Sequence, residues 1–286
     1  MKKDTAILLV YSKDRPGLVN RITGFIHRYG GNILYLDQHA DHEAKDFFMR
    51  IEWELEKFTL TGHDIEAKAL EEVIRPLEMQ YQLYFSSSRP RMAVFVSRHA
   101  HCFADILHRY STGEWQVDIP LVISNHEDMR KQAENYGISY FCLPVTRENK
   151  SEQEAAALSL LAEHEVEFIV LARYMQILSP GFVGHYPNRI INIHHSFLPA
   201  FPGSNPYRSA ADRGVKIIGA TSHYVTSDLD AGPIIEQGIT RVSHRDTVED
   251  MVRKGRDVER VVLAKAVYQH INRKILVLNN RTVVFE

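Results

Sequence analysis

Hydrophobic and polar positions follow two different rhythms along this 286-residue chain, and the change falls near residue 86. Before it, the short apolar runs that predict strands are residues 6–11, 33–39, 46–55 and 81–85. Between them, residues 18–29 and 65–77 carry apolar side chains at helical spacing. This order predicts a ferredoxin-like βαββαβ sheet with both helices on one face.

After a polar, proline-ended segment, strand-like and helix-like patterns alternate. The predicted strands are residues 91–97, 117–124, 140–144, 168–172, 189–193, 216–225 and 234–242, and the predicted helices are 100–110, 126–136, 152–164 and 248–270. Residues 275–278 and 282–285 predict a terminal hairpin. Near-continuous apolar strands indicate a Rossmann-like, mostly parallel α/β sheet. We therefore expect domains at 1–85 and 92–286, joined by a linker at 86–91.

Bulk composition narrows the class of protein. With 34 basic and 36 acidic side chains, the net charge of −2 gives no reason to expect nucleic acid as a partner. The two cysteines, Cys102 and Cys142, fit a reducing cytosol. The apolar run at 6–11 is shorter than a signal-peptide core of ~7–15 residues. No stretch reaches the ~18 apolar residues of a membrane span, so we expect a cytoplasmic protein without a membrane partner.

The most informative chemistry lies where a predicted strand ends. Asn192 and His194 are two residues apart, so their side chains point the same way from a strand. Asp230 follows in a turn-rich loop at residues 227–233. An amide donor, an imidazole and a carboxylate are what formyl transfer needs: a carbonyl polariser, an acid and a partner base. An isolated Asn-x-His at a strand end is more often structural, which leaves the assignment open on these residues alone.

This Asn-x-His…Asp pattern resembles the catalytic signature of the folate-dependent formyltransferase family, as do the runs at 171–180, 219–225 and 230–235. The resemblance implies that Asn192 donates to the formyl oxygen and that His194 lies beside it as an imidazolium paired with Asp230. It places His223 near the site as a second hydrogen-bonding histidine. It requires neither a metal nor a cofactor, since 10-formyltetrahydrofolate is the substrate.

The same resemblance implies a folate pocket. Met175, Ile177 and Leu178 match the segment that holds the pterin, and Val225 with the loop at 226–230 matches the opposite wall. Backbone groups beside apolar walls suit a flat bicycle with a donor and acceptor edge. An ordinary core strand would show the same apolar residues.

The acceptor of the formyl group divides the family. Transferases that act on glycinamide ribonucleotide hold its phosphate on a glycine-rich loop, whereas residues 97–103 contain no glycine. Water is the simplest acceptor left, and a transferase of that class is the alternative. A tRNA-acting relative would need a basic face and a further domain. His99, His101 and Cys102 lack the second ligand cluster of a structural zinc site, so we expect no metal.

The segment 14–18, followed by glycines after the first helix, is similar to the ACT domain, a module that binds amino acids and pairs with its own copies. This resemblance names Gly17, Leu18, Gly31 and Asn32 as effector residues, with glycine or methionine as the effector. A turn with a helix cap would look alike.

Taken whole, the chain resembles the branch of the formyltransferase family that hydrolyses 10-formyltetrahydrofolate to tetrahydrofolate and formate. That branch balances one-carbon pools and supplies formate for purine biosynthesis. Its ACT-like domain implies a homo-oligomer, a dimer or a tetramer. A non-enzymatic amino-acid sensor on the same fold is the remaining alternative, and the intact Asn192, His194 and Asp230 argue against it.

Overall fold

The computed structural model describes residues 4–200 and 206–286, which form two compact units. The first unit contains the chain up to Arg89 together with Arg273–Leu276 and Val283–Glu286, and the second contains Pro90–Asn272 and Val277–Thr282. The division after Arg89 falls inside the predicted linker. The prediction assigned the C-terminal hairpin to the domain at 92–286. Part of this hairpin, Arg273–Leu276 and Val283–Glu286, makes its contacts within the first unit.

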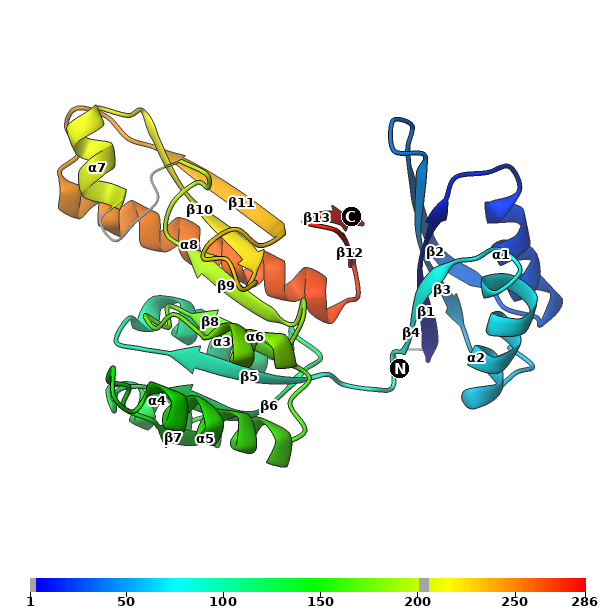
Figure 1. Ribbon diagram of the computed structural model, residues 1–286, viewed down its shortest axis with the longest axis horizontal. Coiled ribbons are helices and arrows are strands. Elements are labelled where there is room, and N and C mark those ends of the chain that lie inside the picture. The colour runs from blue at the N-terminus through cyan, green and yellow to red at the C-terminus, as the bar shows by residue number, and fades with distance from the viewer. Residues whose placement is uncertain (1–3, 201–205) are drawn as a thin grey trace. The chain divides into compact units, whose positions relative to one another are not determined.

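The first unit has the predicted ferredoxin-like architecture. Its elements are β1 (Thr5–Lys13), α1 (Leu18–Arg28), β2 (Ile33–Asp41), β3 (Asp46–Glu54), α2 (His63–Ala69), the π-helical turn η1 (Leu70–Ile74) and β4 (Gln80–Phe85). The antiparallel sheet has the order β2-β3-β1-β4. Both α1 and α2 lie on one face of it (Figure 1).

Burial explains why the pattern of β3 alternates imperfectly. On the helix side, Met49 and Ile51 belong to the core, as expected for one face of a half-covered sheet. On the other face Phe48 and Arg50 are also buried. The Arg50 Nε donates to the carbonyl of Arg273 at 3.0 Å, so the C-terminal segment of this unit accounts for part of that burial.

The second unit is built on a seven-stranded sheet of order β11-β10-β9-β8-β5-β6-β7. Its strands are β5 (Arg91–Val96), β6 (Asp118–Ser124), β7 (Ser139–Cys142), β8 (Phe168–Ala172), β9 (Ile190–His194), β10 (Ile217–Tyr224) and β11 (Ile234–Arg241). The pairs from β7 to β9 are parallel, and β10 runs antiparallel to both of its neighbours. The prediction of a mostly parallel sheet is confirmed.

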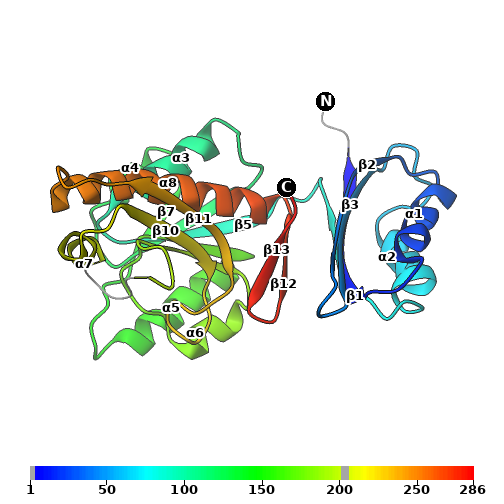
Figure 2. The ribbon, with the colours of Figure 1, turned by 90° about the horizontal axis from the view of Figure 1, so that it is seen from above.

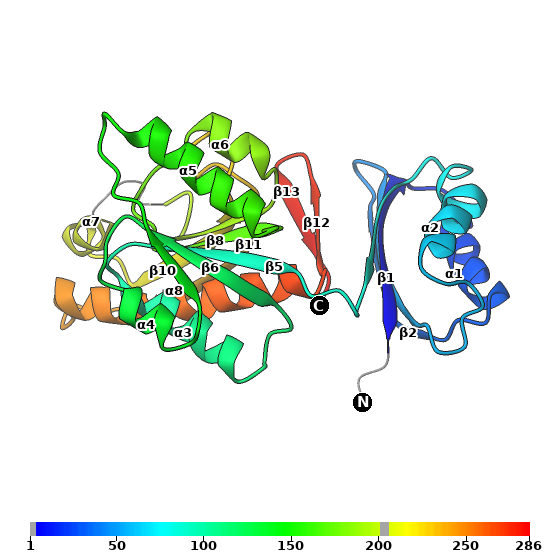
Figure 3. The same cartoon turned by 90° about the horizontal axis from the view of Figure 1, so that it is seen from below.

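Helices cover both faces of this sheet, as Figures 2 and 3 show. The helices are α3 (Ala100–Ser111), α4 (Arg130–Glu134), α5 (Lys150–Glu163), α6 (Pro180–His185), α7 (Pro206–Arg213) and α8 (Val248–Ile271). The sequence did not predict α6 and α7, which are too short to show a helical period. Strands β12 (Ile275–Leu278) and β13 (Arg281–Val284) form the predicted hairpin. No helix within the described ranges is long and apolar enough to cross a membrane.

Two glycines of the first unit test this packing. A Cβ on Gly31 would lie 2.5 Å from Cγ2 of Ile26 and 3.0 Å from Cδ2 of Phe58, whereas a Cβ on Gly24, inside α1, would meet nothing within 4 Å. We predict that Gly31→Ala lowers the free energy of unfolding by about 1–3 kcal/mol, because the core is overpacked. Gly24→Ala should raise it by up to about 1 kcal/mol through helix propensity. Urea unfolding of both variants checks this, and equal effects would contradict it.

Candidate active site

The candidate site lies at the carboxyl ends of the parallel strands, where open α/β sheets bind ligands. Ser97 follows β5, and its hydroxyl accepts a hydrogen bond from the backbone N–H of Met175 at 3.0 Å. The same hydroxyl donates to Oδ1 of Asn125, after β6, at 2.6 Å. Because these groups are buried or half-buried, the bonds fix the loop after β8 beside its neighbours.

Antiparallel pairing of β9 with β10 brings the predicted catalytic residues together. Asn192 lies opposite His223 across this pair, and His194 lies opposite Thr221. The Nδ1 atom of His194 is 3.3 Å from Oδ2 of Asp230, which comes from the loop after β10. The structure thus places Asn192, His194, His223 and Asp230 in one group, as the resemblance to the formyltransferase family implies.

Hydrogen bonds determine which form of His223 faces this group. Its Nδ1 lies 2.9 Å from the carbonyl oxygen of Tyr224, which only an N–H can satisfy. Burial lowers the pKa of His223, the largest of several effects, so the neutral ring is favoured. Its Nε2 then accepts from Nδ2 of Asn192 at 3.3 Å. One N–H of the Asn192 amide is thereby used, and the second is left for a ligand.

Charge and burial make the pair of His194 and Asp230 suited to acid–base work. The hydrogen bond from His194 lowers the pKa of Asp230, against the opposing effect of burial, so the carboxylate is favoured. The Nε2 atom of His194 is buried and has no hydrogen-bond partner among the described residues. A buried imidazole nitrogen without a partner is costly, and a ligand oxygen would satisfy it.

The predicted folate residues fall into two groups. Met175 and Ile177 have 52% and 61% of their surface exposed, which is unusual for two apolar side chains on one short loop. Leu178 and Val225 are half-buried and pack against the same core cluster. The predicted proline-rich loop after β9 falls at residues 201–203, which lie outside the described residues.

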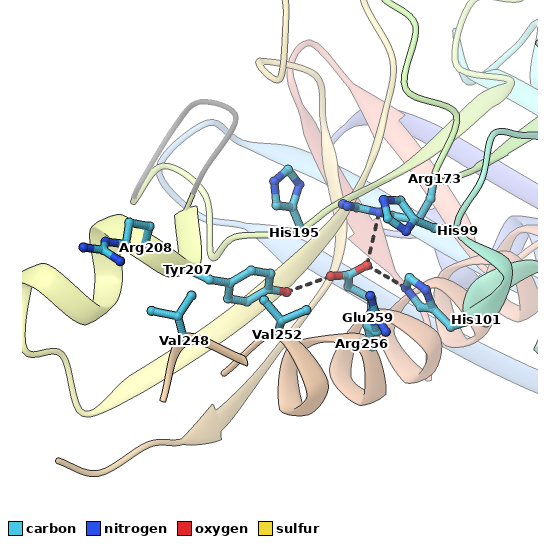
Figure 4. Close-up of a pocket in the computed structure, with 10 residues that line it drawn as sticks. All are labelled: His99, His101, Arg173, His195, Tyr207, Arg208, Val248, Val252, Arg256 and Glu259. Carbon is cyan, nitrogen blue, oxygen red and sulfur yellow. Dashed lines mark hydrogen bonds and ion pairs between the residues drawn. The ribbon is translucent and has the colours of Figure 1, made fainter. Parts of the chain in front are cut away.

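His195, the residue after His194, lines a different cavity from that formed around Asp230 (Figure 4). His99 and His101, at the start of α3, line it as well. Sequence analysis missed Glu259, which lies at the centre of this cavity's contacts with its side chain 2% exposed. Its only signal was an acidic residue among the buried positions of the long helix α8.

The carboxylate of Glu259 has three partners. Its oxygens lie 2.8 Å from Nε2 of His101, 2.7 Å from the hydroxyl of Tyr207 and 3.5 Å from Nε of Arg173. His101, Cys102 and Glu259 are also the group of described residues that could share a metal ion. Burial raises the pKa of the Cys102 thiol, which disfavours the thiolate a metal needs, and Arg173 already neutralises the carboxylate. We therefore assign the cluster as an ion pair with hydrogen bonds.

The proposed effector residues lie at the ends of α1. Gly17 precedes the helix with a φ of 91°, a left-handed conformation that favours glycine. Leu18 points into the core with 2% of its surface exposed, so only its backbone is available to a ligand. Gly31 packs on Ile26, and Asn32 is exposed at the start of β2.

Comparison with known proteins identifies the family. The formyl transferase profile matches residues 90–267, and the ACT domain profile matches residues 6–78. Formyltetrahydrofolate deformylase of Synechocystis is 52% identical over 285 residues, covering 100% of both chains. The crystal structure of a formyltetrahydrofolate deformylase from Pseudomonas syringae has a TM-score of 0.96 at 42% identity, covering 100% of this chain and 95% of that one. This chain belongs to the formyltetrahydrofolate deformylase family.

Similarity to transferases is narrower than similarity within this family. A glycinamide ribonucleotide transformylase from Symbiobacterium toebii has a TM-score of 0.65 at 30% identity, and the match covers 98% of that chain but 72% of this one. The combination of an ACT domain with a formyltransferase domain, predicted from the sequence, is confirmed.

The loop that carries Asp230 allows a clean test of its role. Asp230 has a φ of 54°, and asparagine is tolerated in this left-handed region, so Asp230→Asn keeps the backbone. We predict at least a ~10²-fold loss of hydrolysis with folate binding retained, because the amide cannot accept a proton. Asp228→Asn, at an exposed position of the same loop, is the control. Formate release by each variant decides, and near-wild-type turnover of Asp230→Asn would remove Asp230 from the mechanism.

Proposed function

We propose that this chain hydrolyses 10-formyltetrahydrofolate to tetrahydrofolate and formate, with Asn192, His194 and Asp230 as its catalytic residues. Full-length similarity to formyltetrahydrofolate deformylases supports the reaction. The observation that supports the residue assignment is the buried Nε2 of His194. No described residue forms a hydrogen bond with it, while Nδ1 of the same ring faces Asp230. The substrate's formyl oxygen is the acceptor that this geometry lacks.

Attack on the formyl carbon is the first step. The oxygen of a water molecule bonds to that carbon, and the electron pair of the carbonyl moves onto its oxygen. The free N–H of Asn192 and the N–H of His194 donate to this oxyanion, and each such donor typically contributes a factor of ~10²–10³ in rate. His223 has a positioning role, because its Nε2 fixes the orientation of the Asn192 amide.

Proton transfer then completes hydrolysis. Asp230 accepts a proton from the attacking water and passes it to N10 of the folate as the carbon–nitrogen bond breaks. Formic acid loses its remaining proton at neutral pH and leaves as formate. The pair with His194 keeps Asp230 ionised before the attack, as its lowered pKa requires.

The apolar residues predicted to bind folate suit the pterin ring. We assign Met175 and Ile177 to one wall and Leu178 and Val225 to its base and opposite wall. Exposed apolar side chains next to half-buried ones offer a flat aromatic ring both contact area and a fixed floor. Burial of Met175 and Ile177 by the substrate would remove an apolar surface that water otherwise contacts.

A transferase acting on glycinamide ribonucleotide is the second candidate, favoured only by the shared fold of the second unit. The segment 97–103, which joins the end of β5 to the first turn of α3, has no glycine. His99 and His101 occupy this position with half-buried imidazoles, and His101 is held by Glu259. These features favour water as the acceptor.

We predict that glycinamide ribonucleotide does not accept the formyl group from this protein. Mass spectrometry of the products, with and without the ribonucleotide, separates the two reactions. Formate should be released at the same rate in both cases, because the glycine-free loop offers no converging N–H groups to the phosphate. Formylated ribonucleotide forming faster than free formate would assign the protein to the transferases.

The ACT domain supports a regulatory proposal. We propose that glycine or methionine binds beside Gly17 and Asn32, where a helix N-terminus offers backbone N–H groups to a carboxylate. We further propose a homo-oligomer, a dimer or a tetramer, because the strands β2 and β4 leave two sheet edges that copies of the domain can use. A role in one-carbon balance and in supplying formate for purine biosynthesis fits a cytoplasmic location, as do the two free cysteines.

We predict that binding of an amino-acid effector changes the rate of formate release by ~5–150-fold, the usual range of allosteric coupling. Calorimetric titration of the full-length protein with glycine, methionine and the other common amino acids measures binding, and parallel assays measure activity. Gly17→Ala should weaken binding, because alanine is strained at a φ of 91°. Absence of both heat and activity change would leave the domain with assembly alone.

A further inference from the structure

The cavity lined by His195 is chemically unlike the folate pocket. It has a volume of about 190 Å³ and lies between α3, α7 and α8 (Figure 4). Its lining residues are His99, His101, Arg173, His195, Tyr207, Arg208, Val248, Val252, Arg256 and Glu259. Three arginines and three histidines thus face one acidic side chain, and this imbalance sets the character of the cavity.

The single carboxylate cannot neutralise the arginines. Glu259 is satisfied by Arg173, His101 and Tyr207, as described above, so one formal charge of each sign is balanced within the cluster. Arg256, on α8, also lines the cavity and is exposed (Figure 4). Arg208 is partly balanced by Asp212, 3.3 Å away on the surface. Within the part of the chain that the structure describes, Arg256 has no ion-pair partner, so its positive charge is left over.

An independent observation points to a ligand. The side chain of Arg173 is 11% exposed, yet its buried Nε has no hydrogen-bond partner within the described ranges. The 3.5 Å separation from Glu259 is long for a charged hydrogen bond. Arg173 also adopts a φ of 63°, a conformation that costs free energy for a side chain of this kind. The structure therefore holds a guanidinium at this position at some cost and leaves part of its donor capacity unused.

The pKa of His99, which lines the same cavity, is affected by the same positive charges. The pKa of His99 is lowered first by burial and then by the positive charges of Arg173, His101 and Arg256. A positive charge added to this cavity is disfavoured, and a negative charge is favoured for the same reason.

We propose that this cavity binds a small oxyanion, a carboxylate or a phosphate group, between the guanidinium groups of Arg173 and Arg256. Planar guanidinium groups match the paired oxygens of both anions. One source is formate, the product of the proposed function, which would be released beside His194 while the adjacent His195 lines the cavity. The other source is a phosphate-bearing metabolite or inorganic phosphate. The anion site itself goes beyond the proposed function and does not require it.

Binding to the free, full-length protein tests the proposal without any folate. The thermal unfolding midpoint is measured against increasing sodium formate, and separately inorganic phosphate, at constant ionic strength set with sodium chloride. A ligand of the native state raises the midpoint in a saturable way, from which an apparent Kd follows. Formate saturating at the lower concentration assigns the site to the product, and phosphate doing so assigns it to a phosphate group.

Variants on one helix locate the site. Arg256→Gln should weaken the tighter anion at least about tenfold, the usual effect of losing one charge-assisted hydrogen bond. Arg256→Lys keeps the positive charge but loses the planar guanidinium, so its Kd for the anion should lie between those of the wild type and Arg256→Gln. Arg253→Gln is the matched control, because Arg253 is exposed on the same helix, pairs with Asp250 and does not line the cavity. Lack of a saturable response to either anion, or equal Kd values for wild type and Arg256→Gln, would overturn the proposal.

Discussion

The antiparallel pairing of β10 with β9 is the constraint on which the candidate active site depends. If β10 were parallel to β9, Asn192 and His194 would still lie at the carboxyl end of β9. The pairing that puts His223 opposite Asn192 would then be lost. Reversal of the chain direction at β10 puts His223 opposite Asn192 and returns the chain through the loop that holds Asp230. Four polar side chains from two strands and one loop then meet within hydrogen-bonding range.

Burial gives that meeting its chemical consequences. His223 is nearly inaccessible to solvent, and its Nδ1 is committed to a backbone carbonyl, so the ring is a fixed acceptor toward Asn192. Asp230 is less buried and bonded to His194, so its carboxylate form is favoured. The two histidines of this group differ in their surroundings. Nδ1 of His194 faces a carboxylate oxygen of Asp230, whereas Nδ1 of His223 faces a backbone carbonyl and only its Nε2 lies near Asp230, at 3.7 Å.

Burial also explains the cluster of partners around Glu259. A buried carboxylate is stable only when paired, and here a guanidinium, an imidazole and a phenol surround it. This arrangement fills the position after β5 with side chains instead of a glycine-rich loop. The second unit shares its fold with the transferases, but residues 97–103 of this chain contain no glycine. Fold and chemistry are set by different residues.

The sequence by itself determined the periodic parts of this protein. Apolar spacing predicted α1, the long helix α8 and the buried parallel strands, because each pattern reflects one face or one layer of a core. The Asn-x-His spacing on β9 also followed from strand geometry alone. Tertiary structure decided what depends on contacts between distant segments: the second buried face of β3, the short α6 and α7, and the neutral form of His223. It also decided the three partners of Glu259, because a single acidic residue in a helical sequence does not indicate which side chains will surround it once the chain has folded.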